Sequence, residues 1–426
     1  MSDDKPEVEE TEGEFHIPLE DELPPPPGPA PSATPVTPSF ASLVRPLTAG
    51  VLSSPPPARK YLVRDANNEG VLLRGCVALL GAAGGSCKSW AVVQLAIAVA
   101  TGGKWFGAWP VEQGRVLLVL AEEHFEEVLR RFHFALKGGG ELHDLAKLAD
   151  ISANITLVPA AGIGLALTFE RDRDSGALPE TPRVQEIRDV LQNAARDGKP
   201  YSLVVLDPSS RFAGGDVEKD NAAATRYVQV LETMTAPRCG QPTVLLPAHT
   251  RKRGRDDEAG STDALRGASG LRDAVRWVAM LERRQFVEGA PELLDLRVGK
   301  SNYTPRTALA LCSDRELEGA LRVATAEDFN AYDSAKGAAR TGAAGADTIR
   351  AEVLKALSDA PKNTTKLAET LHRDRHKLKP YLETLEREGK LVSRPGAHNA
   401  NVWSLAPMPG ADAEAEHAPT NQGVET

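Results

Sequence analysis

The sequence predicts an α/β fold, with a mainly parallel β-sheet followed by a small C-terminal winged helix-turn-helix. Three observations favour this organisation. Short apolar runs alternate with helical patterns over residues 58–330, a Gly/Ala-rich stretch occupies 331–346, and a compact helical pattern fills 347–405. Continuous apolar strands separated by helices are typical of a parallel sheet that is covered on both faces.

The two ends of the chain carry too much charge and proline to form a core. Residues 1–57 combine acidic runs with DELPPPPGPAPSATPVTPS and SSPPPAR, and residues 406–426 are again acidic. We therefore expect a disordered acidic, Pro-rich arm and a disordered tail. The arm either keeps the protein soluble or docks a partner.

The formal net charge of -9 comes from these ends. Residues 1–23 carry ten acidic side chains against Lys5 alone, so the span from 24 to 405 has a small positive charge. The acidity of the whole chain therefore does not exclude a polyanionic partner such as a nucleic acid.

Cysteine usage and hydropathy indicate a cytoplasmic protein. The four cysteines are far apart and form no CxxC pair, which argues against a zinc site and a disulfide framework. No apolar run reaches the roughly 18 residues of a membrane helix. The acidic N-terminus lacks the basic start and apolar stretch of a signal peptide, so we expect no membrane contact.

Within residues 58–330, the apolar runs and the helical patterns follow each other in a regular order. The clearest helix is SWAVVQLAIAVATGG, directly after the first run. The last runs follow each other without helices, so we expect them to add an antiparallel edge to the sheet. The predicted strands are VLLRGCVALLG, VLLVLAEE, NITLVPA, YSLVVLDP, PTVLLPAH, AVRWVAMLE and ELLDLRVGK.

The C-terminal module has the pattern of three helices and a β-hairpin. Ile349, Val353 and Leu357 share one helical face, NTTKLAETLH offers a Thr cap, and RDRHKLKPYLETLEREGK forms a third helix before Gly389. KLVSRPGAHNANVWSL indicates two strands around a turn. The Gly/Ala-rich residues 331–346 in front of this module indicate a flexible linker.

The stretch GAAGGSCKSW, residues 81–90, has the pattern of a phosphate-binding loop between a strand and a helix. Its N–H groups attract phosphate oxygens, Lys88 supplies a positive charge to the β- and γ-phosphates, and Ser89 can ligate Mg²⁺. The loop therefore predicts a nucleotide site. The residues expected to contact the nucleotide are Ala83, Gly84, Gly85, Ser86, Cys87, Lys88, Ser89 and Trp90.

Cys87 departs from this pattern because it stands where the last glycine before the lysine is expected. The phosphate contact at this position comes from the amide, so a small side chain is tolerated if φ is negative. A left-handed backbone would strain a cysteine. Two alternatives remain: a strand-to-helix turn without a ligand, and a reactive or redox-regulatory thiol.

Two further strands end in acidic residues. Asp207 ends LVVLD, where a carboxylate at the C-terminal edge of a central strand would hold the hydration shell of Mg²⁺. Glu122 and Glu123 end VLLVLAEE and could polarise the attacking water. A strand-end acid alone is equally a helix cap or a solvated loop charge. The lysine loop, the glutamate pair and the aspartate in this order favour a catalytic site.

Together, these motifs resemble the RecA-like P-loop ATPases of the plasmid RepA type, a group of hexameric replicative helicases and related phage proteins. The resemblance covers about residues 55–325 and is carried by GGSCKSW, GRVLLVLAEEHFEEVLRRF, YSLVVLDPSSRFAGGD, VLLPAHTRKRG, LRGASGLRDAVRW and VGKSNY. It implies that Glu122 is the catalytic carboxylate and Asp207 the Walker B acid. It also implies that His249 senses the γ-phosphate, although Ala248 replaces the first of the family's two histidines and a packing role for His249 is the alternative.

Arg266, in LRGASG, and Lys300, in VGKSNY, are candidates for a positive charge that reaches into the site of a neighbouring subunit. There it would stabilise phosphate charge in the transition state. The alternative for each residue is a surface ion pair. The trans role requires an oligomer, and the resemblance implies a homo-oligomer such as a hexamer.

A basic loop directly after the sensing strand predicts a contact with single-stranded DNA. Its sequence TRKRGRDDEAGSTD resembles loops that face the central channel of ring-shaped RecA-like motors, where cations follow phosphates with little sequence readout. The alternative is a solvated loop, because acidic residues 256–258 offset part of its charge. Its basic residues are Arg251, Lys252, Arg253 and Arg255.

A second basic group predicts binding of duplex DNA by the C-terminal module. It lies in the first turns of the third helix, which a helix-turn-helix presents to the major groove. Pro380 removes a helix hydrogen bond unless it falls in the first turn, so this helix starts later or kinks. The alternative is a domain for protein contacts or oligomerisation. The basic residues are Arg375, His376, Lys377 and Lys379.

The sequence thus predicts an ATP-binding and ATP-hydrolysing enzyme that uses Mg²⁺ and acts on DNA. The resemblance makes it a replicative helicase of a plasmid, a phage or an integrated element. The alternatives are a DNA-binding regulator in which ATP is a conformational ligand, and a helicase-loading factor with little motor activity.

Overall fold

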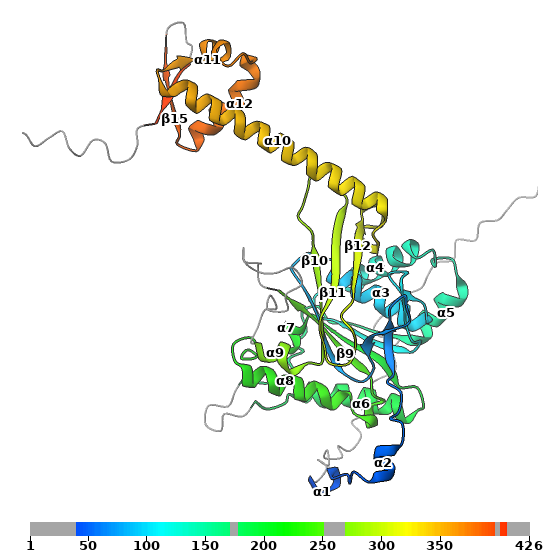
Figure 1. The fold of residues 1–426 in the computed structure, drawn as a ribbon. Helices are drawn as coiled ribbons and strands as arrows, with labels where there is room; N and C mark the ends of the chain where they lie inside the picture. The colour runs from blue at the N-terminus through cyan, green and yellow to red at the C-terminus, as the bar shows by residue number, and fades with distance from the viewer. Residues whose placement is uncertain (1–39, 171–177, 251–268, 397–400, 407–426) are drawn as a thin grey trace, which may run out of the picture. The chain divides into compact units, whose positions relative to one another are not determined.

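The computed structural model describes residues 40–170, 178–250, 269–396 and 401–406. These residues include a nine-stranded sheet with the order β13-β12-β11-β10-β3-β9-β8-β6-β7 (Figure 1). The strands from β10 to β7 in that order pair in parallel. The strands are β3 (Val77–Ala82), β6 (Arg115–Leu120), β7 (Ile155–Pro159), β8 (Tyr201–Asp207), β9 (Thr243–His249), β10 (Trp277–Arg283), β11 (Glu292–Ser301), β12 (Ala308–Asp314) and β13 (Ala320–Val323).

Strands β11, β12 and β13 extend the sheet from β10 by antiparallel pairing. They follow each other in the chain without a long crossover, which parallel pairing would need. The sequence-based prediction of a mainly parallel sheet with an antiparallel edge is confirmed.

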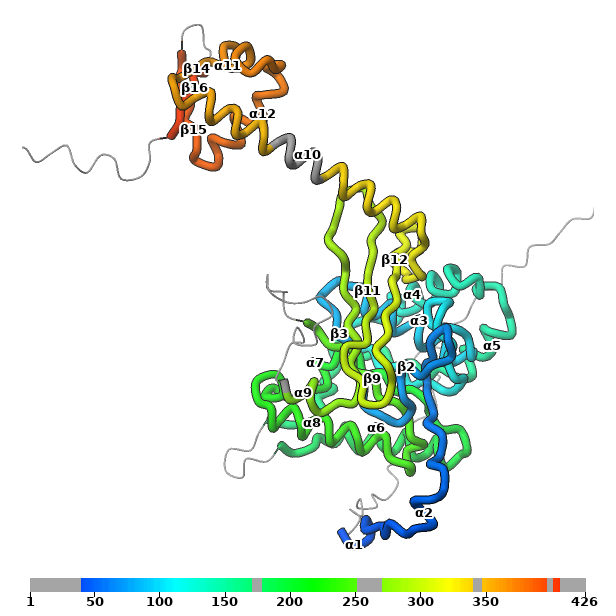
Figure 2. The backbone as a smooth tube through the Cα atoms, viewed as in Figure 1, coloured from blue at the N-terminus to red at the C-terminus, as the bar shows by residue number. Residues whose placement is uncertain are grey.

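Helices cover both faces of the sheet, with α3 and α5 on one side and α6 and α8 on the other (Figure 2). Successive strand residues point to opposite faces, so Leu80 packs with α3 whereas Leu79 packs with α8. Burial on both faces explains why the strands are continuous apolar runs. The helices are α3 (Lys88–Thr101), α4 (Phe125–Gly138), α5 (Leu145–Asn154), α6 (Pro182–Arg196), α7 (Ser209–Phe212), α8 (Asn221–Met234) and α9 (Ser269–Ala274).

Short elements complete this domain at its edges. Two antiparallel pairs lie outside the large sheet, and Trp105 of the second pair is buried and donates to the carbonyl of Ala91 on α3. The pairs are β1 (Tyr61–Arg64) with β2 (Gly70–Leu73) and β4 (Lys104–Trp105) with β5 (Trp109–Pro110), and the 3₁₀ turns are η2 (Pro237–Cys239) and η4 (Arg315–Leu317).

The C-terminal residues form a second core of three helices and a three-stranded antiparallel sheet. Val353, Leu378 and Trp403 are among its buried side chains. Its elements are the end of α10 (Ala326–Ser358), α11 (Thr364–Thr370), α12 (Arg375–Arg387), β14 (Lys362–Asn363), β15 (Leu391–Pro395) and β16 (Asn401–Leu405). The name winged helix-turn-helix stays a prediction for this module.

Residues 331–346, predicted as a flexible linker, lie inside the 33-residue helix α10. A capping box between Thr325 and Asp328 begins this helix. Alanine has the highest helix propensity, so the many alanines in this stretch offset its glycines. The interpretation of this stretch as coil was wrong, and its role as a boundary between domains stays a prediction.

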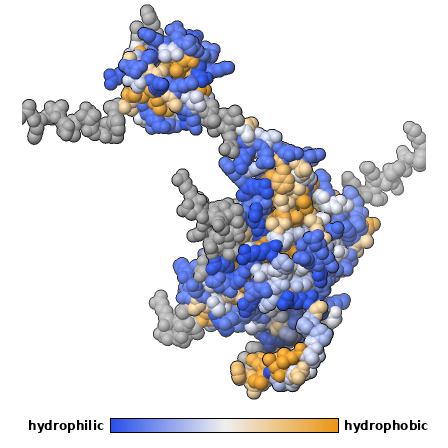
Figure 3. Space-filling model, viewed as in Figure 1, coloured by the Kyte–Doolittle hydropathy of each residue, from blue (hydrophilic) through white to orange (hydrophobic). Residues whose placement is uncertain are grey.

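The described part of the N-terminal arm contains two short helices, α1 (Phe40–Leu43) and α2 (Ala49–Ser53). The prediction of an arm without secondary structure therefore does not hold for these residues. Neither helix buries a residue, and Figure 3 shows their apolar side chains gathered at the surface. Residues 1–39 and 407–426 lie outside the described residues. In the described ranges, no helix is long and apolar enough to cross a membrane.

Candidate nucleotide site

The loop between β3 and α3 bends through two left-handed residues. Gly85 has φ of +74°, and Cys87 has φ of 56° and ψ of 23° at the N-cap of α3. The condition under which a cysteine fits this position without strain, a negative φ, is therefore not met. A non-glycine residue in this region costs roughly 1–2 kcal/mol, which the rest of the fold has to offset.

Lys88, Ser89 and Asp207 converge at the end of the central strands. Lys88 Nζ lies 3.6 Å from Asp207 Oδ1, and Ser89 Oγ donates to Asp207 Oδ2 at 3.0 Å. Lys88 and Asp207 are both buried, at 8% and 4% exposure. The P-loop strand β3 and the Asp207 strand β8 flank β9, which brings the loop and the carboxylate to one sheet edge.

Burial raises the pKa of Asp207, while the charge of Lys88 and the Ser89 hydroxyl oppose the rise. Asp207 Oδ1 is buried and accepts no hydrogen bond from the described residues. A buried carboxylate oxygen without a donor is costly. The Lys88 ammonium at 3.6 Å offsets part of this cost, and a bound metal cation would offset more of it. A serine hydroxyl and a carboxylate at this spacing fit Mg²⁺, which prefers oxygen ligands and retains several waters.

The two glutamates at the end of β6 have different surroundings. Glu122 faces the cavity described below, and its Oε1 accepts from Arg211 Nε at 3.2 Å. Glu123 lies 2.8 Å from Arg131 of α4 and is not among the described residues that line the cavity. Burial raises the pKa of Glu123, and Arg131 opposes this. Glu122 is thus the better candidate for a base, and Glu123 holds Arg131.

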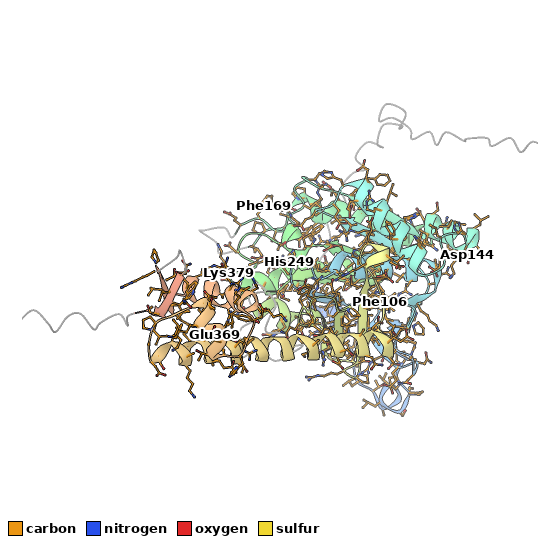
Figure 4. The ribbon with its side chains drawn as sticks, turned by 90° about the horizontal axis from the view of Figure 1, so that it is seen from above. Phe106, Asp144, Phe169, His249, Glu369 and Lys379 are labelled. Atoms are coloured by element: carbon orange, nitrogen blue, oxygen red, sulfur yellow. The ribbon has the colours of Figure 1, made fainter. Side chains whose placement is uncertain are left out.

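His249, labelled in Figure 4, ends β9 beside the P-loop strand. It is in register with Ala82 of β3 and lines the cavity. Its charge is one of the influences that lower the pKa of Asp207. Ala248, which replaces the first histidine of the family pattern, is buried and offers no polar atom in its side chain. The position of His249 is compatible with sensing, which stays a prediction.

A cavity of about 600 Å³ is lined by Lys88, Ser89, Glu122 and His249, among other residues. One wall comes from the P-loop with Glu122 and His249. The other wall comes from α4, from the ends of β10, β11 and β12, and from η4 with the residues after it. The sequence did not predict that these elements lie at the nucleotide site. The charged residues of this wall are Arg131, Arg283, Glu292, Arg315 and Glu318.

Arg283 holds the P-loop from the antiparallel side of the sheet. It ends β10, which pairs in parallel with β3, so its guanidinium reaches the loop and Nη2 donates to the carbonyl of Gly85 at 2.7 Å. The same group forms an ion pair with Glu292 of β11. Only the strand pairing brings these residues together, because Arg283 and Gly85 are far apart in the sequence.

Lys300 lies on β11 and is not among the described residues that line this cavity. Its ammonium donates to the carbonyls of Arg272 and Asp273 at 2.9 and 2.8 Å, near the C-terminal end of α9. Burial lowers the pKa of Lys300, and Asp273 opposes this. These contacts indicate that Lys300 helps to hold the end of α9 in place. The predicted reach into a neighbouring subunit stays a prediction, and Arg266 lies outside the described residues.

The two basic groups predicted to bind DNA differ in what the structure describes. The loop residues Arg251, Lys252, Arg253 and Arg255 lie outside the described residues. Helix α12 begins directly after the cap Asp374, and its residues Arg375, His376, Lys377 and Lys379 are exposed in the first two turns. Pro380 lies inside this helix rather than in its first turn. A later start that would place Pro380 in the first turn is therefore wrong, and the alternative, a kink, stays a prediction.

Comparison with known families agrees with this site. A family model described as an AAA domain matches residues 39–255, just over half of the chain, and includes the P-loop, Glu122 and Asp207. The chain belongs to the AAA domain family. The match to the AAA domain ends in the basic loop, before Arg283 and the antiparallel strands.

Two solved structures show a distant similarity to this AAA domain protein. One is the ATPase domain of another protein, with 12% sequence identity, a TM-score of 0.41 and coverage of 59% of this chain and 86% of that chain. Another is "The Structure Of A DnaB-Like Replicative Helicase And Its Interactions With Primase", with 14% identity and a TM-score of 0.42. It covers 57% of this chain, which spans 56% of that one. A search of curated proteins finds no match.

Proposed function

We propose that the protein is a Mg²⁺-dependent, RecA-like ATPase that acts on DNA. The proposal is carried by Lys88 and Ser89, which contact Asp207 and line the same cavity as Glu122. Membership of the AAA domain family supports nucleotide binding. The described residues hold no cluster of three or more His, Cys, Asp and Glu side chains that would favour a different metal site.

In this proposal each residue has a separate role. Lys88 and the N–H groups of the P-loop bind the β- and γ-phosphates of ATP. Ser89 and Asp207 hold Mg²⁺, which supplies positive charge against the charge that develops on the transferred phosphoryl group. Glu122 accepts the proton of the attacking water, and His249 contacts the γ-phosphate.

The motifs that resemble RepA-type helicases support a replicative helicase of a plasmid, a phage or an integrated element. Such an enzyme would be a homo-oligomer, for example a hexamer, and Arg266 or Lys300 would serve the site of the next subunit. Arg251, Lys252, Arg253 and Arg255 would follow single-stranded DNA.

Unwinding of a forked DNA duplex tests this proposal. We expect ATP-dependent strand separation by the wild type and none by Glu122→Gln, with light scattering reporting an oligomer. Replacing the four basic loop residues by alanine should remove the stimulation of ATP hydrolysis by single-stranded DNA and leave the unstimulated rate unchanged. Strand separation that continues without ATP would contradict the proposal.

A second candidate is an ATP-responsive DNA-binding regulator or a helicase-loading factor. The observation that favours it is the exposed basic group on α12, which is separate from the nucleotide cavity. A regulator would bind a defined duplex equally well in the wild type and in Glu122→Gln. It would lose this binding when Arg375, Lys377 and Lys379 are replaced by alanine. A loader would need a second protein before DNA is unwound.

A further inference from the structure

We propose that Arg211 is a positioning residue for Glu122 in the hydrolysis reaction. This inference rests on the proposed ATPase function. Arg211 lies on α7, directly after β8, and its Nε donates to Glu122 Oε1 at 3.2 Å. Strands β6 and β8 are neighbours, with Leu120 in register with Asp207, so the residues beyond both strand ends come together.

Arg211 acts on the reaction through Glu122 rather than through the nucleotide. Glu122 lines the cavity, whereas Arg211 is absent from the described lining residues. The guanidinium therefore contacts the carboxylate from outside the cavity. It fixes Oε1 and leaves Oε2 of the same carboxylate to accept the proton of the attacking water.

The backbone of Arg211 is held firmly enough for this task. Ser209 and Phe212 on either side are buried, at 4% and 0% exposure. The carbonyl of Phe212 accepts from the amide of Leu167 at 2.8 Å, and the amide of Arg211 donates to the carbonyl of Pro208 at 3.0 Å. A long side chain on a fixed backbone loses less entropy when it holds one carboxylate oxygen.

The Arg211–Glu122 pair itself explains little of the stability of the fold. The side chains are 57% and 42% exposed, and surface ion pairs of this kind contribute little to stability. Its place at the catalytic carboxylate is what sets it apart. Helix α7 also supplies Ser209 and Ser210 to a small cavity that His249 lines. The same short helix therefore lies next to both Glu122 and His249.

The test is the steady-state hydrolysis of ATP by Arg211→Ala, Arg211→Lys and the wild type. We expect Arg211→Ala to lower kcat by between about 10- and 100-fold, because small errors in the position of a reacting group have effects of this size. The KM for ATP and the affinity for a fluorescent ATP analogue should stay at the wild-type values. Arg211→Lys should restore part of kcat, since an ammonium can still hold Oε1.

The matched control is Arg226→Ala, which removes another exposed arginine. Arg226 lies on α8, its partner Glu180 is 3.7 Å away, and neither residue is among the described residues that line the cavity. We expect wild-type kinetics from this variant. A second control is Arg211→Ala in the Glu122→Gln background, where a residue that acts only through Glu122 should cause no further loss.

Three results would overturn the inference: an unchanged kcat in Arg211→Ala, an increased kcat, or an additive loss in the double variant. Each of these leaves the proposed function intact if hydrolysis still requires Lys88 and Glu122. A wild type without Lys88-dependent hydrolysis would instead overturn the proposed function, and the inference with it.

Discussion

The parallel and antiparallel halves of the nine-stranded sheet contribute to the cavity in different ways. In the parallel half, Lys88, Glu122 and Asp207 lie at or beyond the C-terminal ends of three strands that share one edge. Where the antiparallel half begins, Arg283 at the end of β10 pairs with Glu292 of β11, and both line the opposite wall. In the proposed function, the first half supplies the groups for the chemistry, and Arg283 at the start of the second half holds the loop that carries Lys88. Substitutions in the two halves should therefore have different effects.

The largest effect is expected in the parallel half, from Glu122→Gln. Loss of the general base should lower kcat by about 10²–10⁴-fold without weakening ATP binding, because the amide cannot accept the proton. Phosphate release and titration with a fluorescent ATP analogue measure the two quantities. Glu126→Gln, on the exposed first turn of α4, is the control and should behave as the wild type. An equal loss of kcat in the control would contradict this division of roles.

The antiparallel half should respond in stability rather than turnover, and Asp328→Asn tests this. Asp328 pairs with Arg322 of β13 and caps α10, and Arg322 holds the pKa of Asp328 well below its usual range. Loss of these charge-assisted bonds should lower the free energy of unfolding by roughly 1–3 kcal/mol at pH 7. kcat should stay at its wild-type value.

The pH dependence of this effect follows from the sign of the shift. Because the folded-state pKa of Asp328 is lowered, its stabilisation is present above the unfolded pKa of about 3.9 and is lost as the pH falls towards the folded value. The difference in the free energy of unfolding between the wild type and Asp328→Asn should therefore shrink below about pH 4. Urea unfolding over a pH series measures it. Asp347→Asn is the control, because Asp347 is exposed on the same helix and lies 3.9 Å from Arg350. The effect of this substitution on the free energy of unfolding should not change with pH in this way.

A substitution at Cys87, the strained position of the P-loop, should change the free energy of unfolding by a smaller amount and in the opposite direction. Cys87→Gly should raise the free energy of unfolding by roughly 1–2 kcal/mol, because glycine adopts a positive φ without strain. Gly85→Ala should lower it through strain alone, since Gly85 also has a positive φ and no described atom lies within 4 Å of an added Cβ. Thermal unfolding of the two variants and the wild type measures both changes in stability. A loss of stability in Cys87→Gly would mean that the contacts of the thiol outweigh the strain.

The smallest effect is expected from Arg283→Ala, at the boundary between the two halves. Removal of its bond to the Gly85 carbonyl should weaken ATP binding by about 1 kcal/mol, or roughly fivefold in Kd. Arg284→Ala is the matched control, because that neighbour pairs with Asp295 and lies over Phe329 of α10 instead. Equal Kd values of the two variants for ATP would show that the bond from Arg283 to the P-loop does not contribute to ATP binding.

The same division explains what the sequence could predict. Lys88 and Ser89 begin the helix after the loop that follows β3. Glu122 lies just beyond β6, and Asp207 is the last residue of β8, so local patterns are enough to find all four. Strand ends of a parallel sheet meet at one edge, which predicts that these residues converge. The antiparallel edge was also predictable, because the last strands follow each other without helices.

The residues on the other wall could not be found in this way. Arg131, Arg283 and Arg315 reach the cavity only because β10 pairs with β3 and because α4 and η4 pack beside it. No local motif marks such arginines among the many on the surface. The left-handed backbone of Cys87 depends on context in the same way. The helical course of residues 331–346 instead had a local signal. For α10, the propensity of alanine outweighed the glycines that suggested a coil.

The most direct test of the account is the rate of ATP hydrolysis by the purified protein with Mg²⁺, in the presence and absence of single-stranded DNA. Lys88→Ala serves as the reference because it removes the charge expected to bind the phosphates. We expect wild-type hydrolysis that exceeds the Lys88→Ala rate and rises several-fold with DNA. A wild-type rate equal to that of Lys88→Ala under both conditions would contradict the assignment of this cavity as an ATPase site.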